Sequence, residues 1–504
     1  MGQIKKLAGQ TIWYGGSNVA AKLLNSLLTP LLTYLMADRA GMHAFGTISL
    51  IYAYFGVMNV IFTYGMETGY FRFSNKPDTD RKDVFRTTFG SLLVSTLIMT
   101  AILYLLRVPI EQAMGLGGHP EYISIALLIL CFDTLAAIPY AKLRQDNRPK
   151  KYAFTKIGGI LINIILVVFF LIFLPELSVN GNFWHAFTQR FDTVSQILLA
   201  NVFASSFVFF ILIDEWKSFR FKFDKKLWTN IFQYSSPMII IGLAGMINEL
   251  VDRQFLNKLY PGTQEERTII VGIYSANYKI SIVITMFIQA FKMAAEPFLF
   301  SQCNDKNAPV LYARVMNWFV ITLCVAFLVT ALFIDYWKYY IQEDYRVGLY
   351  IVPILLFANI MSGIYYNLSV WYKITDKMRI GVYITVIGAF ITIVGNYFFI
   401  PQYGMLASAW TTLLCYLIMV VICYLWGQKY FPIPYNILKV SFYLIVMLIA
   451  FCMQEIVKLY TPHLWYRTIA GCLLLSIFIF IIIEREAREL SSMPVIGKYI
   501  QRYF

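Results

Sequence analysis

The sequence predicts an all-α polytopic membrane protein with about 14 transmembrane helices. Three observations lead to this fold class. Of the 504 residues, 59% are hydrophobic and only 14% are charged, whereas roughly a quarter of the residues of a soluble protein are charged. The apolar residues form blocks of roughly 20, the length that crosses the hydrocarbon layer as a helix. The basic residues gather in alternate connecting segments, as they do in cytoplasmic loops.

Each expected span is an apolar block bounded by charged residues or by Pro and Gly. The approximate centres, in chain order, are Leu23, Val57, Val94, Leu130, Ile165, Phe203, Ile241, Ile284, Ile321, Phe357, Ala389, Leu414, Val446 and Leu474. Polar residues interrupt the seventh and eighth blocks. The basic start "MGQIKKLAGQTIWYGG" continues into the first block without a small-residue cleavage site. We therefore expect a retained first span rather than a signal peptide.

The distribution of Lys and Arg predicts the orientation. With a cytoplasmic N-terminus and alternating spans, about 30 of the 42 basic residues fall inside and about 10 outside. The inside loops include "RFSNKPDTDRKDVFR", "AKLRQDNRPKK" and "DEWKSFRFKFDKK". We expect both termini to be cytoplasmic and these loops to face anionic lipids. That placement accounts for the net charge of +14 without a nucleic-acid partner.

The two halves of the chain resemble each other. The second and eighth spans begin with "FGTISLIYAYFGVM" and "VGIYSANYKISIVI", and "KLRQDNRPKKY" before the fifth span resembles "YKITDKMRIGVY" before the eleventh. We expect two pseudo-symmetric six-helix lobes at residues 1–216 and 217–427, followed by two extra helices at 428–504. Paired repeats around a midplane binding site are a common plan for transporters.

A polar stripe runs along the first span, with Lys22 at its centre. Within about 100° of arc on a helical wheel lie Thr11, Tyr14, Asn18, Lys22, Asn25, Thr29 and Thr33. A lysine facing lipid at a helix centre costs about 3 kcal/mol or more, a penalty that a water-filled cavity removes. Snorkelling is one alternative, although Lys22 is several turns from either end. Helix–helix hydrogen bonding explains the Asn and Thr residues but not the ammonium group. We favour the cavity.

Further polar residues occur in spans of both halves, although interfacial anchoring accounts equally well for charges at helix ends. Cationic side chains around a central cavity would suit an anionic ligand, phosphates above all. The candidate substrate-binding residues are Lys22, Asn18, Asn25, Asn59, Glu67, Arg72, Arg253, Lys279, Gln289, Lys292 and Glu296. Asp133 and Asp252 are candidates for ion coupling. Asp133 could instead be a structural partner for a basic residue such as Lys156.

The sequence contains no catalytic signature. The four histidines are not spaced as metal ligands, the seven cysteines are scattered, and no glycine-rich phosphate loop precedes a lysine and a hydroxyl residue. We therefore expect a protein that is not an enzyme, with no metal and no cofactor. H⁺, Na⁺ and the membrane potential are the alternative energy sources.

The stretch "NYFFIPQYGMLASAWTTLLCY", residues 396–416, resembles a hallmark of the multidrug/oligosaccharidyl-lipid/polysaccharide (MOP) exporter superfamily. Pro401 and Gly404 predict a hairpin of about four residues, and Ala407 and Ser408 permit close helix packing. The segments "LAGQTIWYGGSNVAAKLLNSLLTPLLTYLM" and "FTYGMETGYFRF" resemble the oligosaccharide flippase branch, the polysaccharide biosynthesis proteins.

This resemblance implies a flippase for a polyprenyl-pyrophosphate-linked oligosaccharide, such as an O-antigen (lipopolysaccharide) or capsule repeat unit. The flippase would work by alternating access in the cytoplasmic (inner) membrane of a bacterium. Lys22, Arg253, Lys279 and Lys292 are the candidates for the cationic residues of its central cavity. We expect a monomer that cooperates with polysaccharide-assembly machinery. The alternatives are a lipid II flippase of peptidoglycan synthesis, a cation-coupled multidrug exporter, and a membrane scaffold for glycan-synthesis enzymes.

Overall fold

A computed structural model describes residues 2–76, 79–146, 148–178, 182–217, 219–301, 307–375 and 377–491, and its regular elements there are all helical. The first half contains α1 (Gly2–Ala40), α2 (Met42–Thr63), α3 (Met66–Ser74), α4 (Arg81–Leu105), α5 (Arg107–Met114), α6 (Pro120–Gln145), α7 (Pro149–Val168), the π-helical turn η1 (Phe169–Phe173), α8 (Leu174–Leu177), α9 (Phe183–Arg190), α10 (Thr193–Ile211) and α11 (Ile213–Trp216). The remainder contains α12 (Lys225–Leu259), α13 (Gln264–Ser301), α14 (Ala308–Ala331), α15 (Ile334–Trp337), the 3-10 helices η2 (Lys338–Tyr340) and η3 (Glu343–Ile351), α16 (Val352–Leu368), α17 (Val370–Ile374), α18 (Met378–Tyr403), α19 (Met405–Tyr430), α20 (Ile437–Tyr460) and α21 (Leu464–Ser491).

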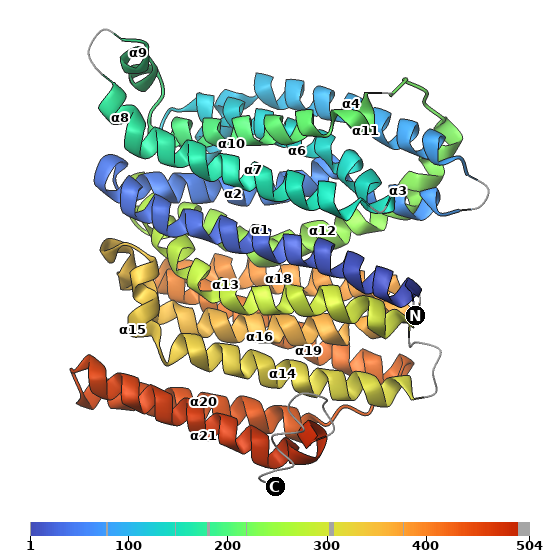
Figure 1. Cartoon of the computed structure of the whole chain (residues 1–504). Coiled ribbons are helices and arrows are strands. Elements are labelled where there is room, and N and C mark those ends of the chain that lie inside the picture. Colours follow the sequence, from blue (N-terminus) through green and yellow to red (C-terminus); the bar gives the residue numbers. More distant parts are fainter. Residues whose placement is uncertain are drawn as a thin grey trace.

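The long helices run side by side along one axis (Figure 1). In the described part of the chain, 13 helical segments are long and apolar enough to cross a membrane, and the 39-residue α1 runs alongside them. Every predicted span centre lies in one of these helices, which confirms the prediction of about 14 spans. Below, the near end of the bundle is the end at which α1 begins, and the far end is the opposite one.

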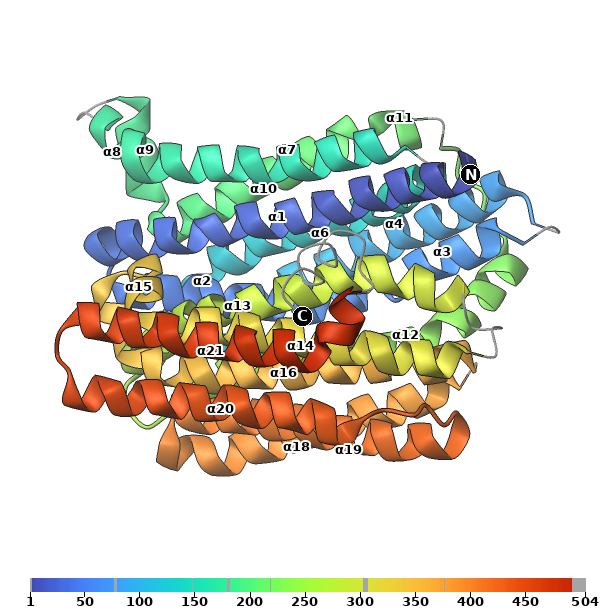
Figure 2. The ribbon, with the colours of Figure 1, turned by 60° about the horizontal axis from the view of Figure 1, so that its bottom comes forward.

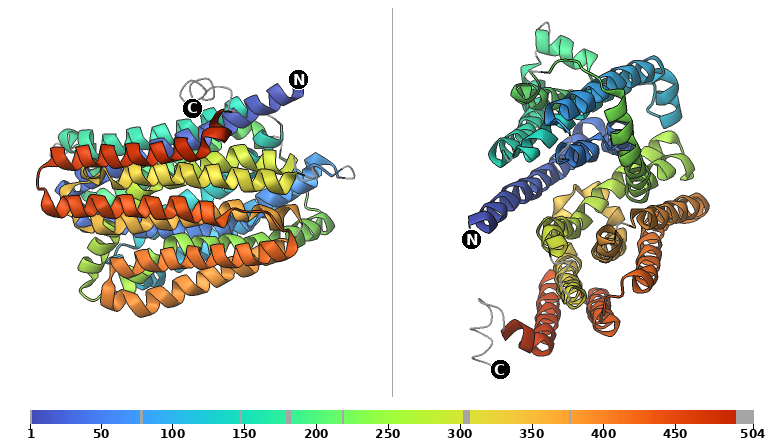
Figure 3. Two further views of the ribbon diagram at one scale, coloured as in Figure 1. Left: turned by 90° about the horizontal axis from the view of Figure 1, so that it is seen from below. Right: turned by 90° about the vertical axis from the view of Figure 1, so that its right-hand side faces the viewer.

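The helices form two lobes, with two additional helices outside the second. In Figure 3 the helices α1–α11 and α12–α19 occupy opposite sides of the molecule, and α20 and α21 pack against α14 (Figure 2). The predicted boundary at 216/217 falls between α11 and α12, whereas 427/428 falls in the last turn of α19. These residue limits stay a prediction.

Small residues bring the two lobes into close contact along one seam, where α2 and α3 pack against α12 and α13. At the far end, a Cβ atom on Gly46 would lie 1.9 Å from the Thr268 carbonyl oxygen. Towards the near end, a Cβ atom on Gly69 would lie 2.5 Å from Cγ2 of Ile231. Residues without a large side chain allow helix backbones to approach this closely. The lobes therefore touch near both ends of this seam.

The hairpin between α18 and α19 is shorter than predicted. The α18 helix continues through Pro401 to Tyr403, and Gly404 alone, at φ +53°, connects it to α19. The neighbouring Asn396 side chain is buried: its Nδ2 donates to the Thr392 carbonyl at 2.9 Å, and Ser408 Oγ donates to its Oδ1 at 3.0 Å. The Asn and the small residues of this motif therefore hold two helices together.

Basic side chains gather at the near end of the first lobe. The Glu215 carboxylate is 2% exposed and lies 2.6 Å from Arg148 Nη1, 3.0 Å from Lys151 Nζ and 3.4 Å from Lys142 Nζ. A hydrogen bond from Lys217 also holds the pKa of the neighbouring Asp214 carboxyl below its ordinary value. These charges join the loops after α6 and α10 to each other.

Candidate functional site

A central cavity of about 420 Å³ lies between the lobes and is enclosed by helices from both of them. The first lobe contributes α1, α2, α6, α7 and α10, and the second contributes α12 and α13. The polar lining residues are Asn25, Thr29, Ser49, Tyr52, Asp133, Asn163, Asn201, Arg253, Ser275 and Lys279. Four of the predicted site residues therefore meet in one cavity: Asn25, Asp133, Arg253 and Lys279.

The second lobe supplies the cationic wall of this cavity. The Arg253 guanidinium is held in place by hydrogen bonds from Nε to Ser275 Oγ and from Nη1 to the Glu249 carbonyl, both of 3.2 Å. Its Cζ also lies 4.8 Å from the centre of the Tyr278 ring, a cation–π contact. Lys279 follows Ser275 by one turn of α13, so both side chains lie on the face towards the cavity.

Lys22 joins this cationic wall from α1 without lining the cavity itself. It lies one turn before Asn25, while Leu23 and Leu27 on the other face of α1 are 51% and 55% exposed. Glu249 of α12 interacts electrostatically with both Lys22 and Lys279. Neither lysine has a carboxylate within 4.0 Å among the side chains that the structure describes.

The excess of positive charge is confined to the residues that line the cavity. Lys22, Arg253 and Lys279 contribute three positive charges, and Glu249 and Asp252, which interact electrostatically with them, contribute two negative charges. Asp133 on the opposite wall brings the formal sum of these six residues to zero. Of the charged side chains that line the cavity itself, however, Arg253 and Lys279 are cations and Asp133 alone is an anion, so the lining carries +1 and can accept an anionic group.

The polar side chains with which the first lobe lines the cavity are not basic. The Asp133 side chain is exposed to the cavity and has Ser205 as a hydrogen-bonding neighbour. Asn201 Nδ2 donates to the Tyr52 hydroxyl at 2.9 Å. Lys156, the predicted alternative partner of Asp133, lies with its Nζ 3.4 Å from the Tyr152 hydroxyl. This wall offers amide, hydroxyl and carboxylate groups that can bind hydroxyls.

A break in the second span directs two predicted site residues away from the cavity. Tyr64 and Gly65 are in the left-handed conformation, with φ of +31° and +71°, and separate α2 from α3. The polar face of α2 therefore does not continue along α3. Glu67 forms an ion pair with Arg144, and Arg72 Cζ lies 4.5 Å from the centre of the Tyr234 ring. Both residues lie at the near end of the bundle.

Four further predicted residues also lie outside the central cavity. Asp252 is fully buried and accepts a hydrogen bond from the Tyr274 hydroxyl. Lys292 Nζ donates to the Tyr366 hydroxyl at 2.9 Å. Asn59 is exposed on α2 and Gln289 is half-buried on α13. The side chains of Asn18 and Glu296 lie outside the described residues.

Several polar lining residues were not predicted from the sequence. Asn163 and Asn201 are amide residues in the middle of mainly apolar spans, and Ser49 and Ser275 are small hydroxyl residues. A buried polar side chain in a membrane helix is itself a signal of function. A single one forms no stripe, however, and so a search for periodic patterns misses it.

Comparisons with known proteins agree with this architecture. Residues 7–302 match the family model described as polysaccharide biosynthesis protein. The structure is similar to that of the lipid II flippase MurJ in an inward closed conformation, with a TM-score of 0.71, 15% identity, and coverage of 94% of this chain and 99% of that chain. It is similar to an inward-facing multidrug resistance MATE family transporter of the MOP superfamily, with a TM-score of 0.60, 12% identity, and coverage of 83% and 94%. For the MATE multidrug transporter DinF-BH, the TM-score is 0.57, the identity 14%, and the coverage 85% and 96%. A search of curated protein sequences finds no match.

Proposed function

Because the chain belongs to the polysaccharide biosynthesis protein family, whose model covers residues 7–302, we propose that it flips a lipid-pyrophosphate-linked oligosaccharide. The substrate would pass from the cytoplasmic to the outer leaflet of a bacterial cytoplasmic membrane by alternating access of the two lobes. The observation that carries this proposal is the cationic wall of Lys22, Arg253 and Lys279 at the lobe interface.

The two cations that line the cavity suit the headgroup. A pyrophosphate diester has two negative charges, and Arg253 and Lys279 supply two positive charges to the lining. Hydrogen bonds to charged groups contribute about 1.5–3 kcal/mol each. The fixed guanidinium of Arg253 would orient one phosphate, and the flexible ammonium of Lys279 would follow the other as the lobes move. Asn25, Asn163 and Asn201 would contact sugar hydroxyls.

An apolar groove outside the second lobe suits the lipid chain. It has a volume of about 730 Å³ and is lined by Phe287 and Phe291 of α13, Trp318 of α14 and Glu489 of α21. Trp318 Nε1 donates to the Glu489 carboxylate at 2.9 Å. In this proposal the polyprenyl chain stays in the bilayer along this groove, beside the two extra helices, while its headgroup occupies the cavity.

The basic near end supports an orientation in which this end faces the cytoplasm. Positive side chains are retained on the cytoplasmic side of membranes, so the near end, with its cations around Glu215, would face the cytoplasm and its anionic lipids. The inside-negative membrane potential would then favour outward movement of the headgroup. For two charges the gain is about 4.6 kcal/mol per 100 mV.

Asp133 and Asp252 are the candidates if H⁺ or Na⁺ is coupled as well. The protein is proposed to act as a monomer alongside polysaccharide-assembly enzymes.

The substitution Lys22→Ala tests this function in proteoliposomes loaded with a polyprenyl-pyrophosphate oligosaccharide. We expect the protein to insert normally and flipping to be abolished, because the ammonium at the lobe interface is lost. Lys226→Ala is the matched control, since Lys226 is exposed in the first turn of α12. Full flipping by a normally expressed Lys22→Ala variant would contradict the proposal, and transport of lipid II alone would favour the peptidoglycan alternative.

A second candidate function, cation-coupled export of a drug, is favoured by one observation: Asp133 faces the central cavity. An exporter of cationic compounds would depend on this carboxylate and not on Lys279. Under that alternative Asp133→Asn abolishes drug resistance in an overexpressing strain, whereas Lys279→Gln leaves it intact. The flippase proposal predicts no drug resistance from either the wild type or the variants.

A further inference from the structure

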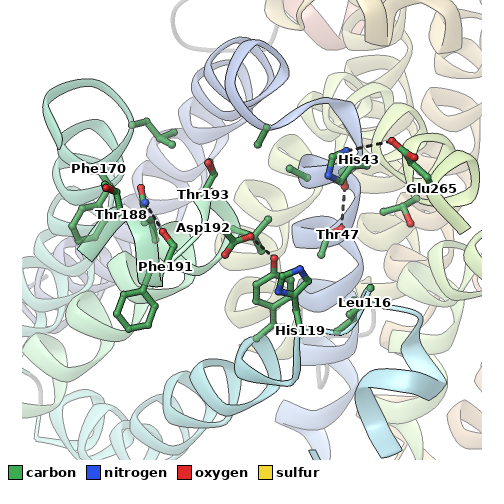
Figure 4. A pocket seen from close by; sticks show the side chains of 18 of the residues that line it. His43, Thr47, Leu116, His119, Phe170, Thr188, Phe191, Asp192, Thr193 and Glu265 are labelled. Atoms are coloured by element: carbon green, nitrogen blue, oxygen red, sulfur yellow. Dashed lines mark hydrogen bonds and ion pairs between the residues drawn. The ribbon is translucent and has the colours of Figure 1, made fainter. Parts of the chain in front are cut away.

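A second and larger cavity, of about 970 Å³, opens at the far end of the bundle (Figure 4). We call it the far-end cavity. Most of its wall belongs to the first lobe, from α2, the start of α6, and the segment from α8 to α10. Glu265 and Gln264 of α13 complete the wall from the second lobe. Both lobes therefore contribute to the wall of the far-end cavity.

Its lining combines fixed polar groups with aromatic rings. Asp192 is held from two sides: it accepts from the Ser195 backbone N–H at 3.0 Å and from the Tyr122 hydroxyl. The His119 ring stacks on Tyr122, with ring centroids 4.8 Å apart and 10° between the planes. Phe191 adds a further ring beside Asp192 (Figure 4). A pocket with a few oriented polar groups between aromatic faces is suited to a small organic ligand.

The charge of the far-end cavity is opposite to that of the central cavity. Of the described residues that line it, none is lysine or arginine, whereas Asp192 and Glu265 are both acidic. Anionic groups such as phosphate would be repelled here. Carboxylate and amide oxygens accept hydrogen bonds from sugar hydroxyls. The C–H face of a pyranose ring packs against aromatic rings. The lining therefore favours an uncharged saccharide.

The two cavities follow one another along the same four helices, α2, α6, the α7–η1 helix and α10. Gln196 lines the far-end cavity and Asn201 the central one, about 7.5 Å apart along α10. Between them lie the buried side chains of Phe45, Val167 and Ile197, which are at most 4% exposed. The π-helical turn η1 interrupts α7 at this level, and such turns frequently occur at functional sites.

We propose that the far-end cavity is a binding site for the uncharged sugar part of the transported glycolipid after its headgroup has entered the central cavity. This inference rests on the proposed function. The glycan would extend past the apolar side chains while the pyrophosphate stays on the cationic wall. Opening of the lobes would withdraw Gln264 and Glu265 from the far-end cavity, so that the sugar is released as the far end opens.

The test uses the full-length protein in nanodiscs and the phosphate-free oligosaccharide released by mild acid from the lipid-linked pool of the native host cell. Binding is measured by equilibrium dialysis, and flipping of the intact glycolipid is measured in proteoliposomes with the same preparations. Thr188→Trp fills the cavity, because the Thr188 side chain lines it. Glu265→Gln removes an exposed acceptor without changing its shape. Gln189→Trp is the matched control, since Gln189 is exposed on α9 and does not line the cavity.

We expect the wild type and Gln189→Trp to bind the phosphate-free oligosaccharide equally, and Thr188→Trp to bind it at least tenfold more weakly. Glu265→Gln should weaken binding about threefold, and both cavity variants should slow flipping. If the wild type flips the glycolipid but does not bind the free oligosaccharide, or if Thr188→Trp binds it normally, the far-end site is refuted alone. If the wild type flips no lipid-linked oligosaccharide, the proposed function is refuted and this inference with it.

Discussion

Replacement of Lys279 by glutamine removes a positive charge from the central cavity while preserving most of the side chain's length. The Lys279 ammonium is the group on α13 that faces the cavity next to Arg253. Two unit charges 4 Å apart attract by about 4 kcal/mol at an effective dielectric constant of 20. Part of this attraction is offset by loss of hydration, which leaves the 1.5–3 kcal/mol that is typical of a hydrogen bond to a charged group. The affinity for the pyrophosphate headgroup should therefore fall by roughly tenfold to 150-fold.

The assay is equilibrium binding of a polyprenyl-pyrophosphate oligosaccharide to the protein in nanodiscs, at several salt concentrations. Lys279→Arg should retain most of the affinity because the charge remains, and Lys226→Gln should bind as the wild type does. The salt dependence should become weaker in Lys279→Gln only. Binding by Lys279→Gln within twofold of the wild type, with an unchanged salt dependence, would refute the view that this wall holds the phosphates.

Three further substitutions test the contact between the lobes at the far end, the charged side chains around Glu215 at the near end, and the hairpin motif between α18 and α19. Gly46→Val should force α2 away from α13 at the far end, because a Cβ there meets the Thr268 carbonyl at 1.9 Å. Labelling of Thr268→Cys by a water-soluble maleimide should then rise, and unchanged labelling would show that this contact does not hold the far end closed. Glu215→Ala leaves three cations around an empty site, so the unfolding free energy should fall by about 3 kcal/mol, with a lower Tm in detergent; an equal Tm would show that the cluster contributes nothing. Asn396→Ala removes the buried acceptor of Ser408 Oγ and should cost about 0.6 kcal/mol, at most roughly 2 kcal/mol, while flipping persists; loss of flipping without loss of stability would give Asn396 a direct role.

The sequence predicted the helices well because span length and apolar composition follow directly from the thickness of the bilayer. All predicted span centres lie in helices, and the expected lobe arrangement is observed. The short helices α5, α9 and α11 were not predicted, because they lie at the bundle ends, where no hydrophobic block marks them. The hairpin at Gly404 is shorter than expected because α18 tolerates Pro401 in its last turn.

The sequence pattern identified a residue that lines the central cavity where one regular helix carries a continuous stripe. Asn25 follows Lys22 by one turn of α1 and does line the central cavity. Glu67 of the second span lies away from the central cavity, because the left-handed residues at Tyr64 and Gly65 break the helical periodicity on which its prediction depends. Asn163 and Asn201 could not be found in this way, since their proximity depends on how α7 and α10 pack in space.

The most direct measurement of the central claim is a structure of the protein in nanodiscs with a polyprenyl-pyrophosphate oligosaccharide bound. We predict density for the two phosphates between the lobes, within hydrogen-bonding distance of Arg253 and Lys279, with the sugars directed towards the far end. Phosphate density at any place remote from Lys22, Arg253 and Lys279, or a central cavity that remains empty at saturating ligand, would contradict the account.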